Sequence, residues 1–219
     1  TINSIMPEAL GSFTIPGALH KQFKEQLENI IDTAPEKFRQ NREMLTRTKQ
    51  IHICNERTQN VLLDFKLSKL KSILSSATLN FIRKMGFISN EIIIHDAWLN
   101  KYNNEGSLPY HIHANSFISG TYFVNFDPKI NSQLGFLNDR VKNAHARVPM
   151  IEIDRDDNVQ TPWNIQEYLA GCEEGTVLLW KSHLIHGFTT PDKGENNRLT
   201  LSFNAIPRVC SQGDQFSFS

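Results

Sequence analysis

The sequence Tyr110-His-Ile-His-Ala114, followed after a short connection by Ile118-Ser-Gly-Thr-Tyr-Phe-Val-Asn-Phe126, contains the residues on which the fold depends. β-Branched and aromatic side chains are concentrated in both segments, as is typical of strands with at least one buried face. Further segments share this character: 91–100, 176–180, 186–190 and 198–204. We therefore expect the second half of the chain to consist of many short strands joined by turns.

Helical periodicity characterises the first part of the chain. Apolar side chains recur at helical spacing over 18–31, and Pro35 follows the end of this stretch. A second helical stretch is expected from about 60 to 84. If this stretch forms two helices instead of one, we expect the break in its serine-rich segment, 72–78.

Helices followed by many short strands predict an α+β fold in which the strands form a sandwich or jelly roll. We expect a single domain over 1–219, with a mainly helical part over 1–90 and a jelly-roll core over 91–206. The polar segment 127–175 is predicted to be a long insertion between strands. Long connections of this kind often serve as lids or binding loops.

Composition and charge exclude several classes of function. The 23 basic and 23 acidic residues balance, so strong attraction to nucleic acid or to an anionic membrane is not expected. No apolar run approaches the length of a membrane span, and the first residues lack the features of a signal peptide. Three widely separated cysteines argue against a disulfide framework and favour a cytoplasmic protein. The oligomeric state is not indicated.

Three histidines lie at the ends of predicted strands. His111 and His113 are two residues apart, so on a strand their side chains share one face. His186 opens a later strand, and neutral imidazole is a good ligand for iron, zinc, copper and nickel. The three together predict a metal site with open positions. Alternatively, the histidines are structural, or Asn115 replaces His113 and His183 replaces His186.

Polar side chains alternate along the last predicted strand. Arg198, Thr200, Ser202 and Asn204 would share one face, while the alternate positions are apolar. Such a polar face is commonly solvated. If it is covered instead, the buried arginine requires a partner, and a carboxylate ligand would supply one through paired, charge-assisted hydrogen bonds. The hydroxyl group of Thr200 or Ser202 would add another bond.

Taken in order, these segments resemble a known family, the 2-oxoglutarate/Fe(II)-dependent oxygenases of bacteria and their phages, related to prolyl hydroxylases. The residues that carry the resemblance are Trp98-Leu-Asn100, Tyr102, Gly106, His111-Ile-His113-Ala-Asn115-Ser, Ser119-Gly-Thr-Tyr-Phe123, Gly175-Thr-Val-Leu-Leu-Trp180, His186 and Arg198-Leu-Thr-Leu-Ser-Phe-Asn204. The ordered set is fairly specific, although each piece alone is weak. It covers roughly 91–206.

The resemblance implies a double-stranded β-helix core with the N-terminal helices packed on it. It implies an Fe(II) ion bound by His111 and His186, and a 2-oxoglutarate cosubstrate gripped by Arg198. We expect His113 to be the third ligand, because neutral imidazole is a far better metal ligand than the side chain of Asn115. It further implies oxidation of an unknown small-molecule or peptide substrate, with release of succinate and CO2, in the cytoplasm of a bacterium or of a phage-infected host. Additional cosubstrate contacts are expected from Thr200, Ser202, Asn204, Tyr122 and Asn115.

Two positions depart from the family pattern. Many relatives have an aspartate or glutamate where this chain has His113, so a third imidazole makes the site more positive by one charge. Relatives often place a tyrosine hydroxyl group near the cosubstrate at the position of Phe123, whereas Tyr122 points to the opposite face. Asn100, Asn115 and Asn204 are candidates to orient the imidazoles.

Two alternative functions remain open from the sequence. One is a cupin-like dioxygenase that binds its metal through three histidines and uses no 2-oxoglutarate. The other is a jelly-roll binding module without enzymatic activity. Arg198 favours the 2-oxoglutarate enzyme over the cupin-like dioxygenase, which does not require a clamp for a dicarboxylate. The metal content of protein purified without oxygen distinguishes the enzyme from the binding module.

Overall fold

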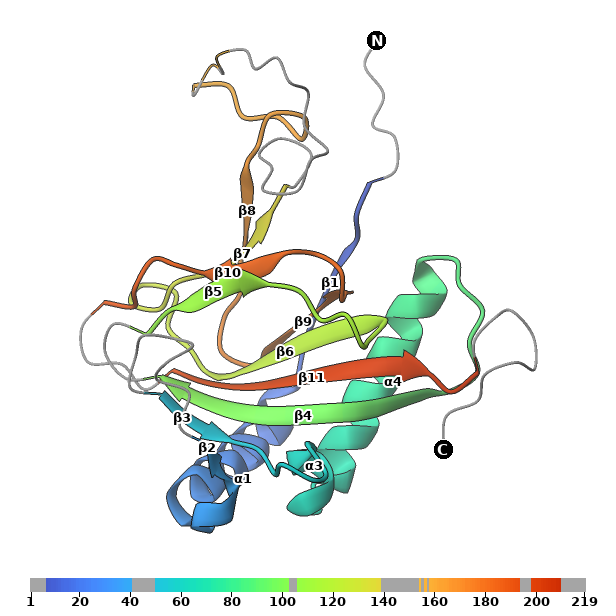
Figure 1. Cartoon of the computed structure of the whole chain (residues 1–219), viewed down its shortest axis with the longest axis vertical. Coiled ribbons are helices and arrows are strands. Elements are labelled where there is room, and N and C mark those ends of the chain that lie inside the picture. The colour runs from blue at the N-terminus through green and yellow to red at the C-terminus, as the bar shows by residue number, and fades with distance from the viewer. Residues whose placement is uncertain are drawn as a thin grey trace.

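The structure, a computed structural model, describes residues 7–40, 50–102, 106–138, 154, 156, 158–193 and 198–209. Two antiparallel sheets face each other and form a jelly roll (Figure 1). The larger sheet has the order β1 (Leu10–Thr14), β9 (Thr176–Lys181), β6 (Ile118–Asn125), β11 (Leu199–Pro207), β4 (Ile92–Tyr102), β3 (Gln50–Ile53) and β2 (Arg39–Gln40). The smaller sheet has the order β5 (Leu108–His111), β10 (His186–Phe188), β7 (Leu134–Leu137) and β8 (Glu167–Ala170). The predicted α+β class and double-stranded β-helix are confirmed.

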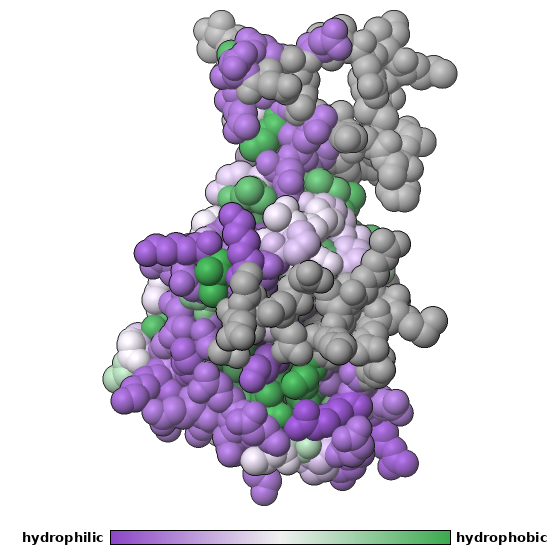
Figure 2. Space-filling view, turned by 90° about the vertical axis from the view of Figure 1, so that its left-hand side faces the viewer, coloured by the Kyte–Doolittle hydropathy of each residue, from purple (hydrophilic) through white to green (hydrophobic). Residues whose placement is uncertain are grey.

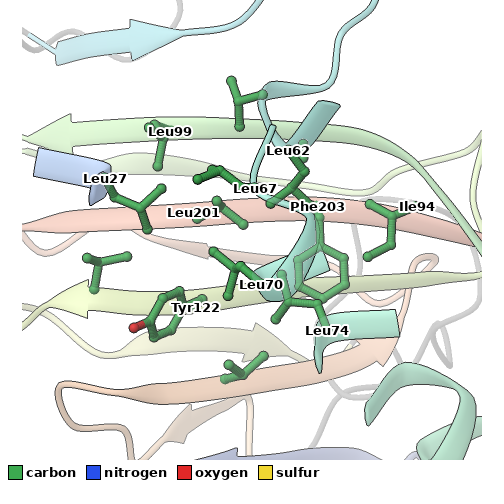
Figure 3. Close-up of a cluster of buried hydrophobic side chains, with 14 of the residues drawn as sticks. Leu27, Leu62, Leu67, Leu70, Leu74, Ile94, Leu99, Tyr122, Leu201 and Phe203 are labelled. Atoms are coloured by element: carbon green, nitrogen blue, oxygen red, sulfur yellow. The ribbon is translucent and has the colours of Figure 1, made fainter. Parts of the chain in front are cut away.

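Helices cover the outer face of the larger sheet (Figure 1). They are α1 (Gly17–Thr33), the 3₁₀ turn η1 (Glu36–Phe38), α3 (Val61–Asp64) and α4 (Ser68–Lys84). Figure 3 shows Leu201 and Phe203 of β11 pointing into the same cluster as Leu70 and Leu74 of α4. All four side chains are almost fully buried. Burial of each such side chain contributes about 1.5–3 kcal/mol, so this face of β11 fixes the strand to the helical layer.

A second apolar cluster lies at one end of the space between the sheets. It contains Phe123, Phe126, Leu134, Phe136, Ala170, Cys172, Leu178 and Trp180. Further along the same space, the side chains on the inner faces of β11 and β6 are polar and largely buried, including Ser119, Thr200 and Asn204. Because buried polar groups require partners, this region differs chemically from the two cores.

The second predicted helix divides, but not at the serine-rich segment. α3 ends at Asp64 and α4 begins at Ser68. Between them Lys66 has a φ of 54°, which an α-helix cannot accommodate. The serine-rich segment continues as regular helix, where Thr78 donates its hydroxyl hydrogen to the carbonyl oxygen of Leu74. The helix is therefore divided by a backbone turn, which the periodicity of the apolar residues does not indicate.

The other predicted strands correspond to β4, β5, β6, β9, β10 and β11. The short strands β1 and β2 were not predicted, and β7 and β8 lie inside the predicted insertion 127–175, whose residues 139–153 are outside the described ranges. β7 and β8 extend away from the body of the molecule (Figure 1). Figure 2 shows the described surface on one side to be mostly hydrophilic, with hydrophobic residues in separate patches. None of the described helices has the length and apolar character required to cross a membrane.

Candidate active site

Two of the predicted metal ligands lie opposite each other on neighbouring strands. His111 ends β5, His186 begins β10, and the two residues are direct partners in the antiparallel pair. Gly187 permits this close approach, since a Cβ atom there would lie 2.6 Å from the carbonyl oxygen of Leu108. The glycine that follows His186 therefore allows the two histidines to meet.

The third histidine reaches the site from outside the strand. β5 ends at His111, so the prediction that His113 shares a strand face with it is wrong. The backbone N–H group of His113 donates instead to the carbonyl oxygen of Ser182, at 3.0 Å. The ring centroids of His111, His113 and His186 are 4.4 to 5.2 Å apart, and one potential ligand nitrogen from each lies within 4.8 Å of the other two.

Hydrogen bonds fix the protonation of two of these rings. Nδ1 of His111 lies 2.8 Å from the carbonyl oxygen of Pro109, and Nδ1 of His186 lies 2.8 Å from that of Leu184. Because a carbonyl oxygen only accepts, each Nδ1 carries the hydrogen, and each Nε2 presents a lone pair. This is the usual arrangement of metal-binding histidines.

Burial keeps the three imidazoles neutral. It lowers the pKa of His186 to about 3, with a further contribution from the neighbouring His111. Burial and the same neighbour lower the pKa of His113 to about 4, and burial lowers the pKa of His111 as well. Neutral imidazole is the form that binds metals, so at neutral pH the three rings have the charge state that a metal ligand requires.

A polar network surrounds His113. Nδ2 of Asn204 lies 3.3 Å from Nδ1 of His113 and 3.3 Å from Oδ2 of Asp96, while Ser119 donates its hydroxyl hydrogen to Oδ1 of Asn204 at 2.8 Å. Burial alone would raise the pKa of Asp96, but hydrogen bonding and the charge of His95 lower it overall. Asn204 therefore orients His113, as predicted for one of the three asparagines.

The alternative ligands lie elsewhere. Asn115 is exposed and donates to Oδ2 of Asp96 at 3.3 Å. The side chain of His183 is 61% exposed and lies 3.5 Å from Glu8. Oδ1 of Asn100, another predicted orienting residue, accepts a hydrogen bond from Nδ1 of His52 at 2.7 Å, in a buried pair that was not predicted from the sequence. Asn115, His183 and Asn100 therefore lie outside the candidate metal site, which consists of three histidines.

Arg198 is buried, with 2% of its surface exposed, directly before β11. Its guanidinium carbon lies 3.8 Å from the ring centroid of Phe188, and 5.3 to 5.4 Å from those of Tyr102 and Phe126. Burial lowers the pKa of Arg198, and the nearby Asp192 opposes this shift. The solvated alternative for Arg198 is therefore excluded, and its guanidinium group is a charged donor in an aromatic box.

The other predicted cosubstrate contacts divide between two faces. Thr200 is buried, and Ser202 lies on β11 with its hydroxyl oxygen 3.1 Å from that of Thr121. Tyr122 is on the opposite face, where its hydroxyl oxygen lies 2.6 Å from Nδ1 of His20 in α1; Figure 3 shows it within the helix-covered cluster. Its predicted contact with the cosubstrate is therefore wrong, because side chains alternate across a strand.

The partners of Arg198 were not predicted from the sequence. Asp192 and Ser132, which come from polar loops without periodicity, both bond to its guanidinium group. Phe188 was recognisable only by its position two residues after His186.

A cavity of about 290 Å³ opens beside the histidine cluster. Its wall includes His113, Trp98, Asp96, Asn115 and Asn204, and also His52, Cys54, Gln40, Glu56 and Gln59 from around the edge strands. The ring of Trp98 lies 5.7 Å from that of His113, centroid to centroid. The cavity thus gives a molecule of moderate size access to the third histidine.

Comparison with known proteins agrees with this chemistry. Residues 96–204 match a protein family described as "Putative 2OG-Fe(II) oxygenase". None of the curated proteins matches the chain.

Solved structures share the fold at low sequence identity. A prolyl-4-hydroxylase from Pseudomonas putida is 12% identical, with a TM-score of 0.55, over 92% of this chain and 94% of that one. HygX from Streptomyces hygroscopicus, with nickel, 2-oxoglutarate and hygromycin B bound, is 11% identical, with a TM-score of 0.59, over 91% and 83%. A Trichoplax adhaerens prolyl hydroxylase in complex with a peptide is 10% identical, with a TM-score of 0.55, over 90% and 83%. The chain belongs to the family of 2-oxoglutarate/Fe(II)-dependent oxygenases, with iron as its metal and 2-oxoglutarate as its cosubstrate.

Proposed function

We propose that the protein oxidises a carbon of its substrate at an iron ion bound by His111, His113 and His186, while Arg198 holds the far carboxylate of 2-oxoglutarate. The main support for this proposal is that the histidine cluster and the guanidinium group of Arg198 both lie beside β10. Phe188, which stacks on the guanidinium group of Arg198, is two residues from His186. Two residues of a strand span about 6.7 Å, which the five-carbon chain of 2-oxoglutarate can bridge.

The donor set fits iron. The potential ligand nitrogens of the three rings lie within 4.8 Å of one another, so the neutral imidazoles could converge on one ion. His111, His113 and His186 would hold the ion. Iron and 2-oxoglutarate, when bound, would supply an oxidative decarboxylation by dioxygen, in which one oxygen atom enters succinate, CO2 is released, and the other oxygen atom oxidises the substrate.

The protein's own residues bind, orient and exclude water. Asn204 holds the His113 ring, and the carbonyl groups of Pro109 and Leu184 hold the other two rings. Aromatic side chains line the opposite end, around Arg198, where a low local dielectric strengthens its attraction for a carboxylate. Orientation of this kind is the main contribution a protein makes to a cofactor reaction.

The substrate is proposed to enter through the cavity beside His113. Its wall is mostly polar, with Trp98 as the large aromatic surface, which suits a hydrogen-bonding molecule or a peptide side chain more than a lipid. The similar HygX and Trichoplax structures contain hygromycin B and a peptide, respectively. A cavity of about 290 Å³ lies near the lower end of the size range of small-molecule sites, so it suits part of a small molecule or one side chain of a peptide.

Succinate formation tests this function. Purified protein incubated with Fe(II), ascorbate and 2-oxoglutarate is expected to convert 2-oxoglutarate to succinate, slowly without a substrate and faster with one. Chromatography with mass detection measures succinate, and an oxygen electrode measures consumption of dioxygen. Metal-dependent oxygen consumption without succinate would instead support the three-histidine dioxygenase that uses no 2-oxoglutarate.

Substitution of His113 tests the third ligand. His113→Ala is expected to weaken metal binding at least about tenfold, since loss even of a group that supports a ligand has effects of this size. His113→Asp is expected to retain metal, because two histidines and a carboxylate form a common Fe(II) site. Anaerobic calorimetric titration with Fe(II) measures both. Equal affinity of His113→Ala and the unmodified protein would show that His113 is not a ligand.

A further inference from the structure

Arg198 has a resident carboxylate partner. Oδ1 of Asp192 lies 3.3 Å from Nη1 of Arg198, and it accepts the backbone N–H of Ser132 at 2.6 Å. The Asp192 side chain is completely buried, and that of Arg198 is 2% exposed. The backbone N–H of Asp192 also bonds to the carbonyl oxygen of Gly106. This ion pair is therefore buried and held by further hydrogen bonds, unlike an ion pair at the protein surface.

The pair engages Nη1 of the guanidinium group. Nη1 carries two hydrogens, and its acceptors are the carbonyl oxygen of Ser132, at 3.0 Å, and Oδ1 of Asp192. A dicarboxylate bound at Arg198 through charge-assisted hydrogen bonds would bring a second carboxylate to the same guanidinium group. Phe188 covers a face of the same group. A bound dicarboxylate and Asp192 would then flank a single positive charge.

We propose that Asp192 determines how tightly the site holds a dicarboxylate, an inference that rests on the proposed role of Arg198. Two carboxylates beside one guanidinium group repel each other, and burial strengthens that repulsion. Asp192 keeps Arg198 paired when the cosubstrate is absent, and it weakens the grip when the cosubstrate arrives. Succinate retains the far carboxylate of 2-oxoglutarate, so Asp192 also promotes release of the product.

Removal of this one charge tests the inference. In the full-length protein loaded with Mn(II), Asp192→Asn is expected to bind 2-oxoglutarate and succinate about tenfold more tightly, as the loss of repulsion between close buried charges predicts. Binding of pyruvate, which has the keto acid but no far carboxylate, is expected to stay unchanged. Calorimetric titration measures the three dissociation constants. Glu173→Gln, the same charge change at an exposed position, is the matched control and should leave all three unchanged.

The outcomes separate this inference from the proposed function. If the unmodified protein fails to bind 2-oxoglutarate, the role of Arg198 itself is wrong. If it binds normally and Asp192→Asn binds with equal or lower affinity, only the inference about Asp192 is overturned. If the variant unfolds when it is purified without ligand, its melting temperature can be measured at increasing concentrations of 2-oxoglutarate. The dependence of the melting temperature on concentration gives the dissociation constant, because a ligand that binds only the folded state stabilises it. A variant that stays unfolded with 2-oxoglutarate would make Asp192 a folding residue and would also overturn the inference.

Discussion

Replacement of His186 by alanine is expected to abolish metal binding and turnover. His186 is 3% exposed and faces both of the other imidazoles. Removal of one ring leaves two nitrogens, of which one, from His113, is anchored only in an irregular segment. We expect the affinity for Fe(II) to fall by at least about a hundredfold. Removal of a group that only hydrogen-bonds to a metal ligand already lowers metal affinity by about 10- to 100-fold, and removal of the ligand itself should cost at least as much.

Two measurements check this result. Metal content after anaerobic reconstitution should fall from one iron per chain to almost none, and succinate formation should fall with it. His183→Ala is the matched control, because that histidine is three residues away, exposed and paired with Glu8. The variant should keep iron and activity. Full iron occupancy in His186→Ala would contradict the proposed ligand set, whereas loss of iron in both variants would indicate a general disturbance of this loop.

The elements with strong periodicity were predictable from the sequence. Alternation of Leu199, Leu201 and Phe203 with polar residues gave both the strand and its buried face, because side chains of a strand alternate between two environments. The histidines His111 and His186 were found through their position at strand ends. In these cases each local signal agrees with the tertiary environment.

The remainder depends on contacts that have no local signal. The strands β7 and β8 have four residues each, which is too short for a clear period. Their pairing is not local, because the polar segment 138–166 separates them in the sequence. Asp192 is recognisable as the partner of Arg198 only when the loop of Ser132 is in place. His113 was assigned to the cluster correctly in space but for the wrong reason, because a backbone bond to Ser182 positions it, and not a strand.

Arg198→Ala is expected to weaken 2-oxoglutarate binding by about 2–5 kcal/mol, the cost of removing a partner from a buried charge pair. This corresponds to a rise of about 30-fold to several thousandfold in the dissociation constant. Arg198→Lys keeps the charge but lacks the planar fork that holds a carboxylate by two bonds, so a smaller loss is expected. Metal affinity should change little in either variant. Calorimetric titration of Mn(II)-loaded protein measures both quantities.

Because Arg198 also neutralises Asp192, its replacement affects folding as well as binding. Arg198→Ala leaves the buried Asp192 carboxylate without its guanidinium partner, and we expect the melting temperature to fall, since breaking a buried pair is costly. Combining it with Asp192→Asn removes that buried charge and should restore much of the stability, but not the affinity for 2-oxoglutarate. If the double variant regained both, the weak binding of Arg198→Ala would reflect a damaged fold, and the guanidinium group would have no direct part in holding the cosubstrate.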